Sequence, residues 1–283
     1  MKTKPFGTTG ADLPVLGQGT WNMPEAGARR KQAQSAIRRG IELGMVHIDT
    51  AEMYGAGRVE ELVGEAIRGI ARERLFIATK VLPSNATYHG TLAAAERSLR
   101  RLGCDYLDLY LLHWPSPHPL GETMRAFDAL VQQGKTRFVG VSNFDTHEML
   151  EAAEHLRAAP LACNQVLYHL CERGIEHELI PAARRARIAI VAYTPFGRGG
   201  FLRAGSGGLD TLQRVAAKHG ASVRQVALAF LTRDPNLFAI AKAARMEHVE
   251  ENARAGSLEL DPQDVAEIDA AYPRPAPGPL AML

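Results

Sequence analysis

The sequence predicts an α/β fold, namely a (β/α)8 TIM barrel with an N-terminal β-hairpin and additional C-terminal helices. The first observation is a polar residue that recurs about every thirty positions, each time directly after a short apolar run: Asp49, Lys80, His113, Ser142, Gln165 and Tyr193. The intervals of 31, 33, 29, 23 and 28 residues fit one strand plus one returning helix. The second observation is that the apolar runs are nearly continuous, as expected of strands that are covered on both faces.

The N-terminal segment precedes this repeat. Residues 5–17 contain Gly7, Gly10 and the sequence Asp12-Leu13-Pro14, which together predict a short hairpin that covers the floor of the barrel. The first barrel strand is predicted at 15–19.

The repeating elements follow in order. Further strands are predicted at 45–48, 75–79, 106–112 and 138–141, and the last apolar run lies at 237–241. Helical patterns occur at 31–43, 59–70, 91–102, 121–132, 146–155, 175–187 and 246–253. The competing fold is an open doubly wound sheet, which is disfavoured because no Gly-x-Gly-x-x-Gly turn follows any candidate strand.

The chain ends in a proline-rich segment. Prolines at 273, 275, 277 and 279 cannot continue a helix, so residues 273–283 are predicted to form an extended tail. A chain of 283 residues suits one barrel of about 250 residues with short additions. We therefore expect residues 1–283 to form a single barrel domain.

Composition argues against several classes of function. The 33 basic and 31 acidic side chains leave a formal charge of +2, so no broad positive field for nucleic acid is expected. The absence of an apolar signal core, and of a run of about 18 apolar residues, favours a cytoplasmic protein without a membrane span. Three scattered cysteines, and histidines without metal-ligand spacing, predict neither a disulfide framework nor a metal. We expect a monomer.

Four polar side chains are predicted to converge at the carboxyl ends of neighbouring strands, where barrels carry their active sites. Lys80 ends an apolar strand and needs a partner if it is shielded from water, and Asp49 ends the preceding strand. Adjacent strands lie about 4.8 Å apart, so the two side chains can meet. Tyr54 follows in a loop from which its ring can fold over Lys80, and His113 ends the next strand. Taken singly, Asp49 would more readily be a helix cap and Lys80 a strand terminus whose ammonium reaches water.

This group suits proton transfer to a carbonyl oxygen. A neighbouring ammonium favours the phenolate, so the pKa of Tyr54 is expected to fall below its usual value near 10. Tyr54 would then donate the proton, while Asp49 holds Lys80 in place. His113 would hydrogen-bond and align the substrate oxygen. No serine or cysteine has an obvious activating base, which suggests that the attacking species is a hydride from a cofactor.

The remaining strand ends suit a nicotinamide. Ser142, Asn143 and Gln165 carry hydroxyl and amide groups that match a carboxamide, and Tyr193 offers a flat face for a ring. The ordinary alternatives are a turn at residues 142–143, a satisfied core amide at Gln165 and simple packing at Tyr193.

The cofactor's phosphates have candidate partners further along the chain. The glycine-rich loop 193–200 contains Arg198 and can lie along a pyrophosphate. Lys242 and Arg245 come just before the predicted helix at 246–253, whose amino end would form a phosphate pocket.

In this order and spacing, the motifs resemble the aldo-keto reductase family over essentially the whole chain, in particular its prokaryotic, diketogulonate reductase-like members. The matching strings are Gly17-Gln18-Gly19-Thr20-Trp21, Asp49-Thr50-Ala51-Glu52-Met53-Tyr54-Gly55, Ala78-Thr79-Lys80, Leu111-Leu112-His113-Trp114-Pro115, Gly140-Val141-Ser142-Asn143-Phe144, Asn164-Gln165-Val166 and Ala192-Tyr193-Thr194-Pro195-Phe196-Gly197-Arg198-Gly199.

The resemblance implies an NAD(P)H-dependent oxidoreductase that reduces aldehydes or ketones to alcohols, with NADP(H) favoured and NAD(H) possible. The implied catalytic residues are Asp49, Tyr54, Lys80 and His113, and the implied substrate pocket contains Trp21, Tyr54, His113 and Trp114. The implied cofactor-binding residues are Gly19, Thr20, Trp21, Asp49, Ser142, Asn143, Gln165, Tyr193, Thr194, Pro195, Phe196, Gly197, Arg198, Ile240, Lys242, Ala243, Arg245, His248, Glu251 and Asn252.

Two positions depart from the family pattern. A proline and a serine often flank the lysine after the last strand, where this chain has Ile240-Ala241-Lys242-Ala243. An arginine often contacts the adenosine phosphate where this chain has His248. A strict preference for NADPH is therefore less strongly implied, although Arg245 can supply a charge nearby.

Two other functions stay open from the sequence. A non-catalytic NADP(H)-binding regulatory protein would keep the cofactor site without turnover. A cofactor-free acid–base isomerase would leave the polar residues of the last four strand ends without a shared purpose. His47, two residues before Asp49 on the same strand face, is expected to be packed structure rather than a further catalytic group.

Overall fold

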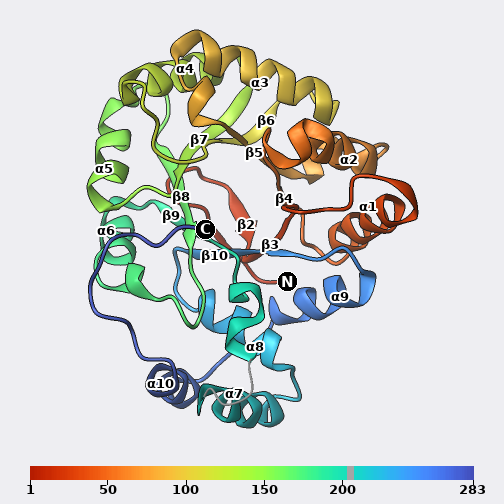
Figure 1. Cartoon of the computed structure of the whole chain (residues 1–283), viewed down its shortest axis with the longest axis vertical. Coiled ribbons are helices and arrows are strands. Elements are labelled where there is room, and N and C mark those ends of the chain that lie inside the picture. Colours follow the sequence, from red (N-terminus) through yellow and green to blue (C-terminus); the bar gives the residue numbers. More distant parts are fainter. Residues whose placement is uncertain (203–206) are drawn as a thin grey trace.

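The computed structural model describes residues 1–202 and 207–283, in which eight parallel strands close into a barrel (Figure 1). Around the barrel the strands follow the order β10-β3-β4-β5-β6-β7-β8-β9. Their bounds are β3 (Leu16–Gly19), β4 (His47–Asp49), β5 (Phe76–Val81), β6 (Leu107–Leu112), β7 (Thr136–Ser142), β8 (Leu161–Leu167), β9 (Ala189–Tyr193) and β10 (Leu237–Lys242). The predicted TIM barrel is therefore confirmed.

Helices cover the outside of this barrel (Figure 1). They are α1 (Gly27–Glu42), α2 (Arg58–Ile67), α3 (Tyr88–Leu102), α4 (Leu120–Gln132), α5 (Thr146–His155), α6 (Leu179–Ala186), α7 (Gly207–Lys218), α8 (Val223–Leu231), α9 (Met246–Ala255) and α10 (Pro262–Ala271). Two of them, α7 and α10, lie farther out, beyond α8 (Figure 1). Short 3-10 turns are η1 (Tyr54–Gly57), η2 (Arg72–Arg74), η3 (Pro83–Asn85), η4 (Gly174–Glu176) and η5 (Gly197–Leu202). Among the described residues, no helix is both long and apolar enough to cross a membrane.

Several predicted helices differ from the structure by one to four residues at an end, and the helix predicted at 175–187 is divided in the structure. The pattern at 175–187 suggested a single helix, but the structure has the turn η4 and then α6, which begins at Leu179. Pro181 explains the break, because its ring has no N–H to donate and clashes with the carbonyl one turn earlier. Proline is tolerated in the first turn of a helix, and that is where Pro181 lies in α6.

The N-terminal hairpin covers the amino end of the barrel, as expected. It consists of β1 (Thr3–Pro5) and β2 (Asp12–Pro14), so it begins two residues earlier than predicted. Between the strands, Phe6 is fully buried and makes edge-to-face contacts with Phe76 at 5.7 Å and Phe238 at 5.1 Å between ring centroids. His47 is buried beside the same rings, which agrees with its predicted role as packed structure.

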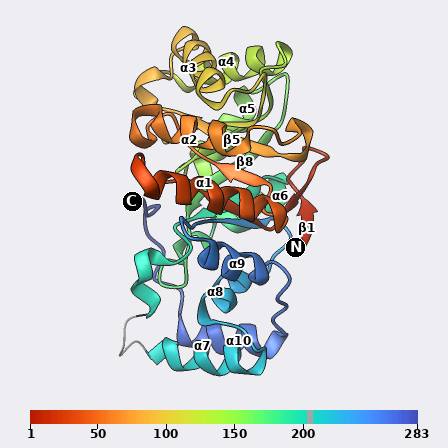
Figure 2. The same cartoon turned by 90° about the vertical axis from the view of Figure 1, so that its right-hand side faces the viewer.

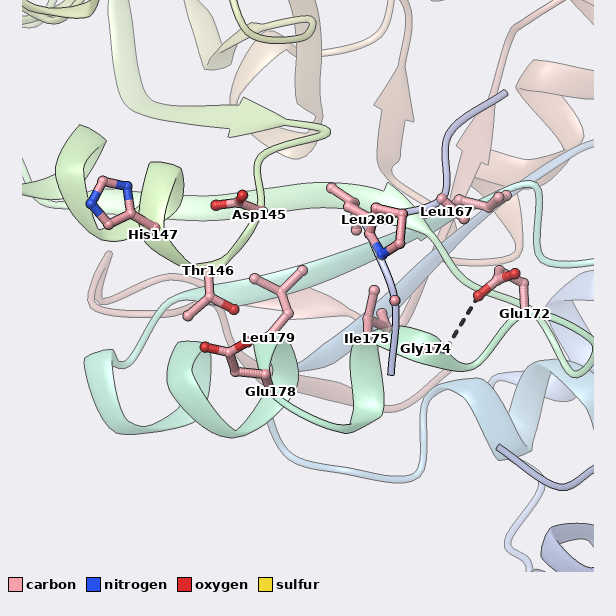
Figure 3. Close-up of a pocket in the computed structure, with 13 residues that line it drawn as sticks. Asp145, Thr146, His147, Leu167, Glu172, Gly174, Ile175, Glu178, Leu179 and Leu280 are labelled. Carbon is pink, nitrogen blue, oxygen red and sulfur yellow. Dashed lines mark hydrogen bonds between the residues drawn. The ribbon is translucent and has the colours of Figure 1, made fainter. Parts of the chain in front are cut away.

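The proline-rich tail returns to the opposite end of the barrel. Residues 273–283 contain neither helix nor strand. The end of the chain lies over the barrel in Figure 1, and Figure 2 places it on the side away from the N-terminal hairpin. Leu280 of the tail joins Leu167, Ile175 and Leu179 in lining a cavity of about 240 Å³ (Figure 3). The tail is thus held against the β8 to α6 region.

Candidate active site

A buried ion pair occupies the carboxyl end of the barrel. Asp49 is paired in register with Ala78, so Lys80 lies two residues further along the neighbouring strand and on the same face. The Lys80 ammonium donates to Asp49 Oδ1 at 2.6 Å and to the Thr50 carbonyl at 2.8 Å. Both side chains are almost completely buried. Burial alone would lower the pKa of Lys80, but the charge of Asp49 and the contact with Tyr54 outweigh it and raise that pKa.

Gln165 completes the environment of this pair from across the barrel. Its side-chain amide donates to Asp49 Oδ2 at 2.8 Å, although β8 and β4 are not neighbours in the barrel. With Lys80 on one oxygen and Gln165 on the other, the buried carboxylate is hydrogen-bonded on both sides. In this structure Gln165 is therefore a satisfied core amide whose partner belongs to the candidate site.

Tyr54 lies on the loop after β4 and covers Lys80. The Lys80 ammonium is 5.2 Å from the centre of the Tyr54 ring. The loop turns sharply through Gly55, Ala56 and Gly57, which all have positive φ angles. Glycine adopts this left-handed conformation readily, whereas Ala56 does so with strain. This turn directs the Tyr54 ring back over the strand ends.

The expected fall in the pKa of Tyr54 is wrong for this structure. Burial is the largest effect and raises the pKa, and it outweighs the nearby Lys80 ammonium, which acts downward as predicted. The negative charge of Asp49 adds to the upward shift. The phenol therefore stays protonated at neutral pH, which is the state that a proton donor needs.

His113 faces Tyr54 at the end of β6. The two ring centroids lie 5.8 Å apart with their planes at 72°. Burial, followed by the charge of Lys80, lowers the pKa of His113 to about 2. Its imidazole is thus neutral, and a neutral imidazole carries one N–H donor. Trp114 packs beside it at 4.9 Å between ring centroids, consistent with a place at the rim of the site.

The strand ends predicted to hold a nicotinamide lie together. Ser142 of β7 is paired in register with Gln165 of β8. Asn143, at a positive φ of 61°, donates to the His113 carbonyl at 3.0 Å and accepts from the Tyr193 hydroxyl at 2.8 Å. Tyr193 also receives a hydrogen bond from the backbone of Leu283, so the end of the tail reaches this group.

The first strand contributes to the same end of the barrel. The Thr20 hydroxyl donates to the backbone carbonyl of Asp49 at 2.8 Å, and Gly19 is paired in register with Lys242 of β10. Trp21 is 48% exposed and lies under Arg198, whose guanidinium is 5.3 Å from the ring centre. This contact joins the segment after β3 to the loop after β9, the two strands that flank β10.

Residues 194–197 form the first part of the loop after β9, and Thr194 and Gly197 have positive φ angles. Pro195 is buried beside Phe196 in this loop. The Phe196 ring lies 5.0 Å from the guanidinium of Arg224 on α8.

The predicted phosphate region lies at the end of β10. Lys242 is exposed there, whereas its neighbours Ile240 and Ala243 are buried. Helix α9 begins just afterwards, and its N-cap residue, Arg245, makes no side-chain cap. The first backbone N–H groups of α9 therefore have no side-chain cap within the described residues, as an anion site requires.

Three further residues of that region were implied by the resemblance. His248 forms a 2.6 Å hydrogen bond with the side chain of Arg245, so both lie on the exposed start of α9. Glu251 accepts from the Ser222 hydroxyl at 2.6 Å, and Asn252 is buried. Glu251 thus has a structural partner, whereas His248 and Arg245 contact each other at the start of α9.

Sequence reasoning missed two contributions to the site. The Thr50 carbonyl that accepts from Lys80 is a backbone group and leaves no side-chain signal. The approach of Leu283 to Tyr193 depends on the path of a proline-rich tail, which has no periodicity to predict it. No cluster of metal-ligating side chains occurs among residues 1–202 and 207–283.

The closed barrel and this buried group at the ends of its strands define the class of (β/α)8-barrel enzymes. Residues 15–273 match the model of the aldo/keto reductase family. Methylglyoxal reductase YeaE of Escherichia coli is 44% identical over 263 residues, covering 93% of this chain and 92% of that protein. Glyoxal reductase of Bacillus subtilis is 35% identical over 263 residues, covering 92% and 90%.

A solved structure agrees with these relatives. The aldo-keto reductase from Klebsiella pneumoniae in complex with NADPH superimposes with a TM-score of 0.92 at 42% identity, covering 100% of both chains. The chain therefore belongs to the aldo/keto reductase family, and the family resemblance predicted from its motifs is confirmed.

Proposed function

We propose that this chain reduces small aldehydes and ketones with NADPH, and that 2-oxoaldehydes are its preferred substrates. The observation that carries the proposal is the convergence of Tyr54, Lys80, Asp49 and His113 at one end of the barrel. The names of two relatives, methylglyoxal reductase and glyoxal reductase, support the substrate class. The Klebsiella structure with NADPH supports the cofactor.

The proposed chemistry divides a two-electron reduction into a hydride and a proton. NADPH, when bound, would supply a hydride to the carbonyl carbon. Tyr54 donates its phenolic proton to the carbonyl oxygen, so the C=O bond becomes a CH–OH group. Lys80 stabilises the phenolate that is left, and Asp49 keeps Lys80 charged and in place.

His113 supplies the second contact to the substrate. A neutral imidazole donates one N–H to the carbonyl oxygen, which aligns that oxygen toward Tyr54 and stabilises the negative charge that develops on it. The low pKa of His113 keeps the ring in this form at neutral pH.

The residues present fit an extended nicotinamide dinucleotide. Ser142 and Asn143 would meet the carboxamide, and the Tyr193 ring would lie against the nicotinamide. Lys242, exposed at the end of β10, and Arg245 would meet the adenosine phosphate. Because Arg245 supplies a positive charge in addition to that of Lys242, we favour NADPH over NADH.

The rival regulatory function is less well supported. A cofactor-binding regulator needs no proton donor, yet a protonated phenol, a charged lysine and a neutral histidine meet at one point here. That combination has a purpose only if a bound substrate is protonated.

The test is the loss of absorbance near 340 nm when the protein is mixed with NADPH or NADH and a panel of methylglyoxal, glyoxal, simple aldehydes, aldoses and keto-sugars. We expect turnover with NADPH and the highest kcat/KM with the two 2-oxoaldehydes. Tight NADPH binding without turnover of any carbonyl would support the regulatory protein instead.

We also propose that residues 1–283 act as one domain and as a cytoplasmic monomer. Every candidate catalytic side chain comes from a strand of one barrel or from the loop or residue that directly follows it, so the site needs no second copy. Light scattering of the purified protein, with a measured mass near 30.8 kDa, would support the monomer, and a dimer mass would contradict it.

A further inference from the structure

The position of Tyr54 depends on a loop rather than on a strand. Three backbone hydrogen bonds fix this loop: Thr50 N–H to the Ala78 carbonyl at 2.9 Å, Glu52 N–H to the Lys80 carbonyl at 3.2 Å and Tyr54 N–H to the Ala51 carbonyl at 3.0 Å. The Glu52 amide therefore makes the last backbone bond between the loop and β5 before the chain reaches Tyr54.

The side chain of Glu52 makes a second connection between the same two segments. It is buried, at 8% exposure, although a carboxylate is costly to remove from water. Its Oε1 accepts from the Leu82 backbone N–H at 2.7 Å and from the Asn85 side-chain amide at 2.9 Å. Its Oε2 lies 3.5 Å from the guanidinium of Arg97 on α3.

All of these partners follow the strand that contains Lys80. Leu82 lies two residues after Lys80, Asn85 lies in the turn η3 and Arg97 lies on the next helix. Glu52 in turn lies two residues before Tyr54. One buried carboxylate thus joins the segment that holds the candidate proton donor to the segment that holds the candidate lysine.

We propose that Glu52 is a positioning residue that fixes the Tyr54 hydroxyl relative to Lys80. This proposal rests on the proposed function, because it requires Tyr54 to be the proton donor. Glu52 does not itself touch a reacting atom; it acts by preventing the loop from moving away from β5. A displacement of about 1 Å in such a group can lower the rate by about a hundredfold.

The first variants are Glu52→Ala and Glu52→Gln. Alanine removes both acceptor oxygens, so we expect kcat to fall about 10- to 100-fold while the dissociation constant for NADPH changes less than twofold. Glutamine keeps one oxygen that can accept from Leu82 and Asn85, so we expect it to retain at least half of the wild-type kcat.

A matched control separates position from stability. Asp108 is also buried, and it accepts from the Ile77 backbone N–H at 2.8 Å and pairs with Arg72 at 2.6 Å, but it lies near the amino end of β6. Asp108→Ala should lower the melting temperature at least as much as Glu52→Ala and leave kcat within twofold, measured well below both melting temperatures.

The outcomes distinguish this proposal from the proposed function. Tyr54→Phe is measured in parallel: if it keeps turnover, the proposed proton donor is wrong. If Tyr54→Phe is inactive while Glu52→Ala keeps the wild-type kcat, or while Glu52→Gln loses as much as Glu52→Ala, the positioning role is overturned. Should Glu52→Ala not fold, Asn85→Ala removes one donor only, and it should lower kcat about threefold or more without changing NADPH binding.

Discussion

The protonation states of single side chains set what this site can do. His113 is neutral because it is buried beside Lys80, and Tyr54 is protonated because burial outweighs the same lysine. The Lys80 ammonium therefore acts on the pKa values of both Tyr54 and His113, and in each case the burial of the side chain has the larger effect. The site has a charged pair at its base and two neutral hydrogen-bond donors above it.

Lys242 is the residue on which coenzyme choice is expected to depend. Lys242→Met should raise the dissociation constant for NADPH at least about tenfold, which corresponds to about 1.4 kcal/mol, and change that for NADH less than twofold. The physical reason is the loss of a charge-assisted contact to the phosphate that only NADPH carries. Fluorescence titration with both coenzymes measures it.

Lys218→Met is the matched control for that experiment, because Lys218 is an exposed lysine paired with Asp261, the N-cap residue of α10, and with Asp264 on that helix. It should leave both dissociation constants unchanged. Equal weakening of NADPH and NADH by Lys242→Met would remove this lysine from the phosphate site.

The protonation of His47 is expected to affect how the stability of the protein changes in acid. Burial lowers its pKa to about 4, and neither ring nitrogen has a hydrogen-bond partner among the described residues. In the unfolded chain a histidine binds a proton near pH 6.5, so below that pH the unfolded state holds more protons and stability falls. Between pH 6.5 and 5 this proton uptake by the unfolded chain should lower the free energy of unfolding by about 2 kcal/mol.

His47→Leu removes the titrating ring and keeps an apolar side chain in the same place. When the pH falls from 6.5 to 5, the free energy of unfolding of the variant should decrease by about 2 kcal/mol less than that of wild type. Urea unfolding at both pH values measures the difference. An identical loss in the two proteins would show that His47 is protonated in the folded state or does not control acid stability.

At the residue scale, the sequence predicted which side chains meet but not every contact. The Asp49–Lys80 pair followed from two strand ends one repeat apart, since neighbouring strands of a barrel bring their ends together. The bond from Gln165 to Asp49 crosses the barrel and depends on the register of non-neighbouring strands, which no local pattern encodes. The direction in which the pKa of Tyr54 shifts depends on the burial of its side chain, which the sequence alone does not give.

At the element scale, local hydrogen bonding decides which boundaries are predictable. Helix α5 has the bounds that its apolar pattern predicted, and in the structure Asp145 and Glu148 form a capping box at its start. The helix predicted at 175–187 was wrong because apolar periodicity continued through Pro181, while the backbone could not. The apolar periodicity at 175–187 therefore predicted which face of the segment is covered, whereas Pro181 determines where α6 starts.

The N-terminal hairpin is expected to be an integral part of the barrel core. Phe6→Ala should lower the free energy of unfolding by about 3–5 kcal/mol, because a fully buried ring is replaced by a cavity between Phe76 and Phe238. Under native conditions kcat should stay near wild type, since Phe6 packs near the starts of β5 and β10, whereas the candidate site lies at the carboxyl ends of the strands.

Denaturant unfolding of Phe6→Ala beside Met246→Ala provides the comparison. Met246 is a large apolar side chain that is 50% exposed, so its loss should change stability by less than about 0.5 kcal/mol. A loss below about 1 kcal/mol for Phe6→Ala would mean that the hairpin contributes little to the folded barrel.

At the scale of the whole molecule, the thirty-residue repeat was enough to predict the closed barrel. Each repeat supplies one strand and one covering helix, and eight strands complete the ring. The tail was not predictable in the same way, because a proline-rich segment makes no regular hydrogen bonds and its path depends on contacts such as that of Leu280. The two ends of the chain thereby come to opposite ends of one barrel (Figure 2).

The central claim is that Tyr54 donates the proton in an NADPH-dependent reduction. The most direct test is Tyr54→Phe, which removes only the hydroxyl, compared with wild type for methylglyoxal turnover and for NADPH binding. We expect kcat to fall at least about a hundredfold while the dissociation constant for NADPH changes less than twofold, since general acid catalysis contributes about 10²–10⁴-fold. Turnover at the wild-type rate by Tyr54→Phe would contradict the account.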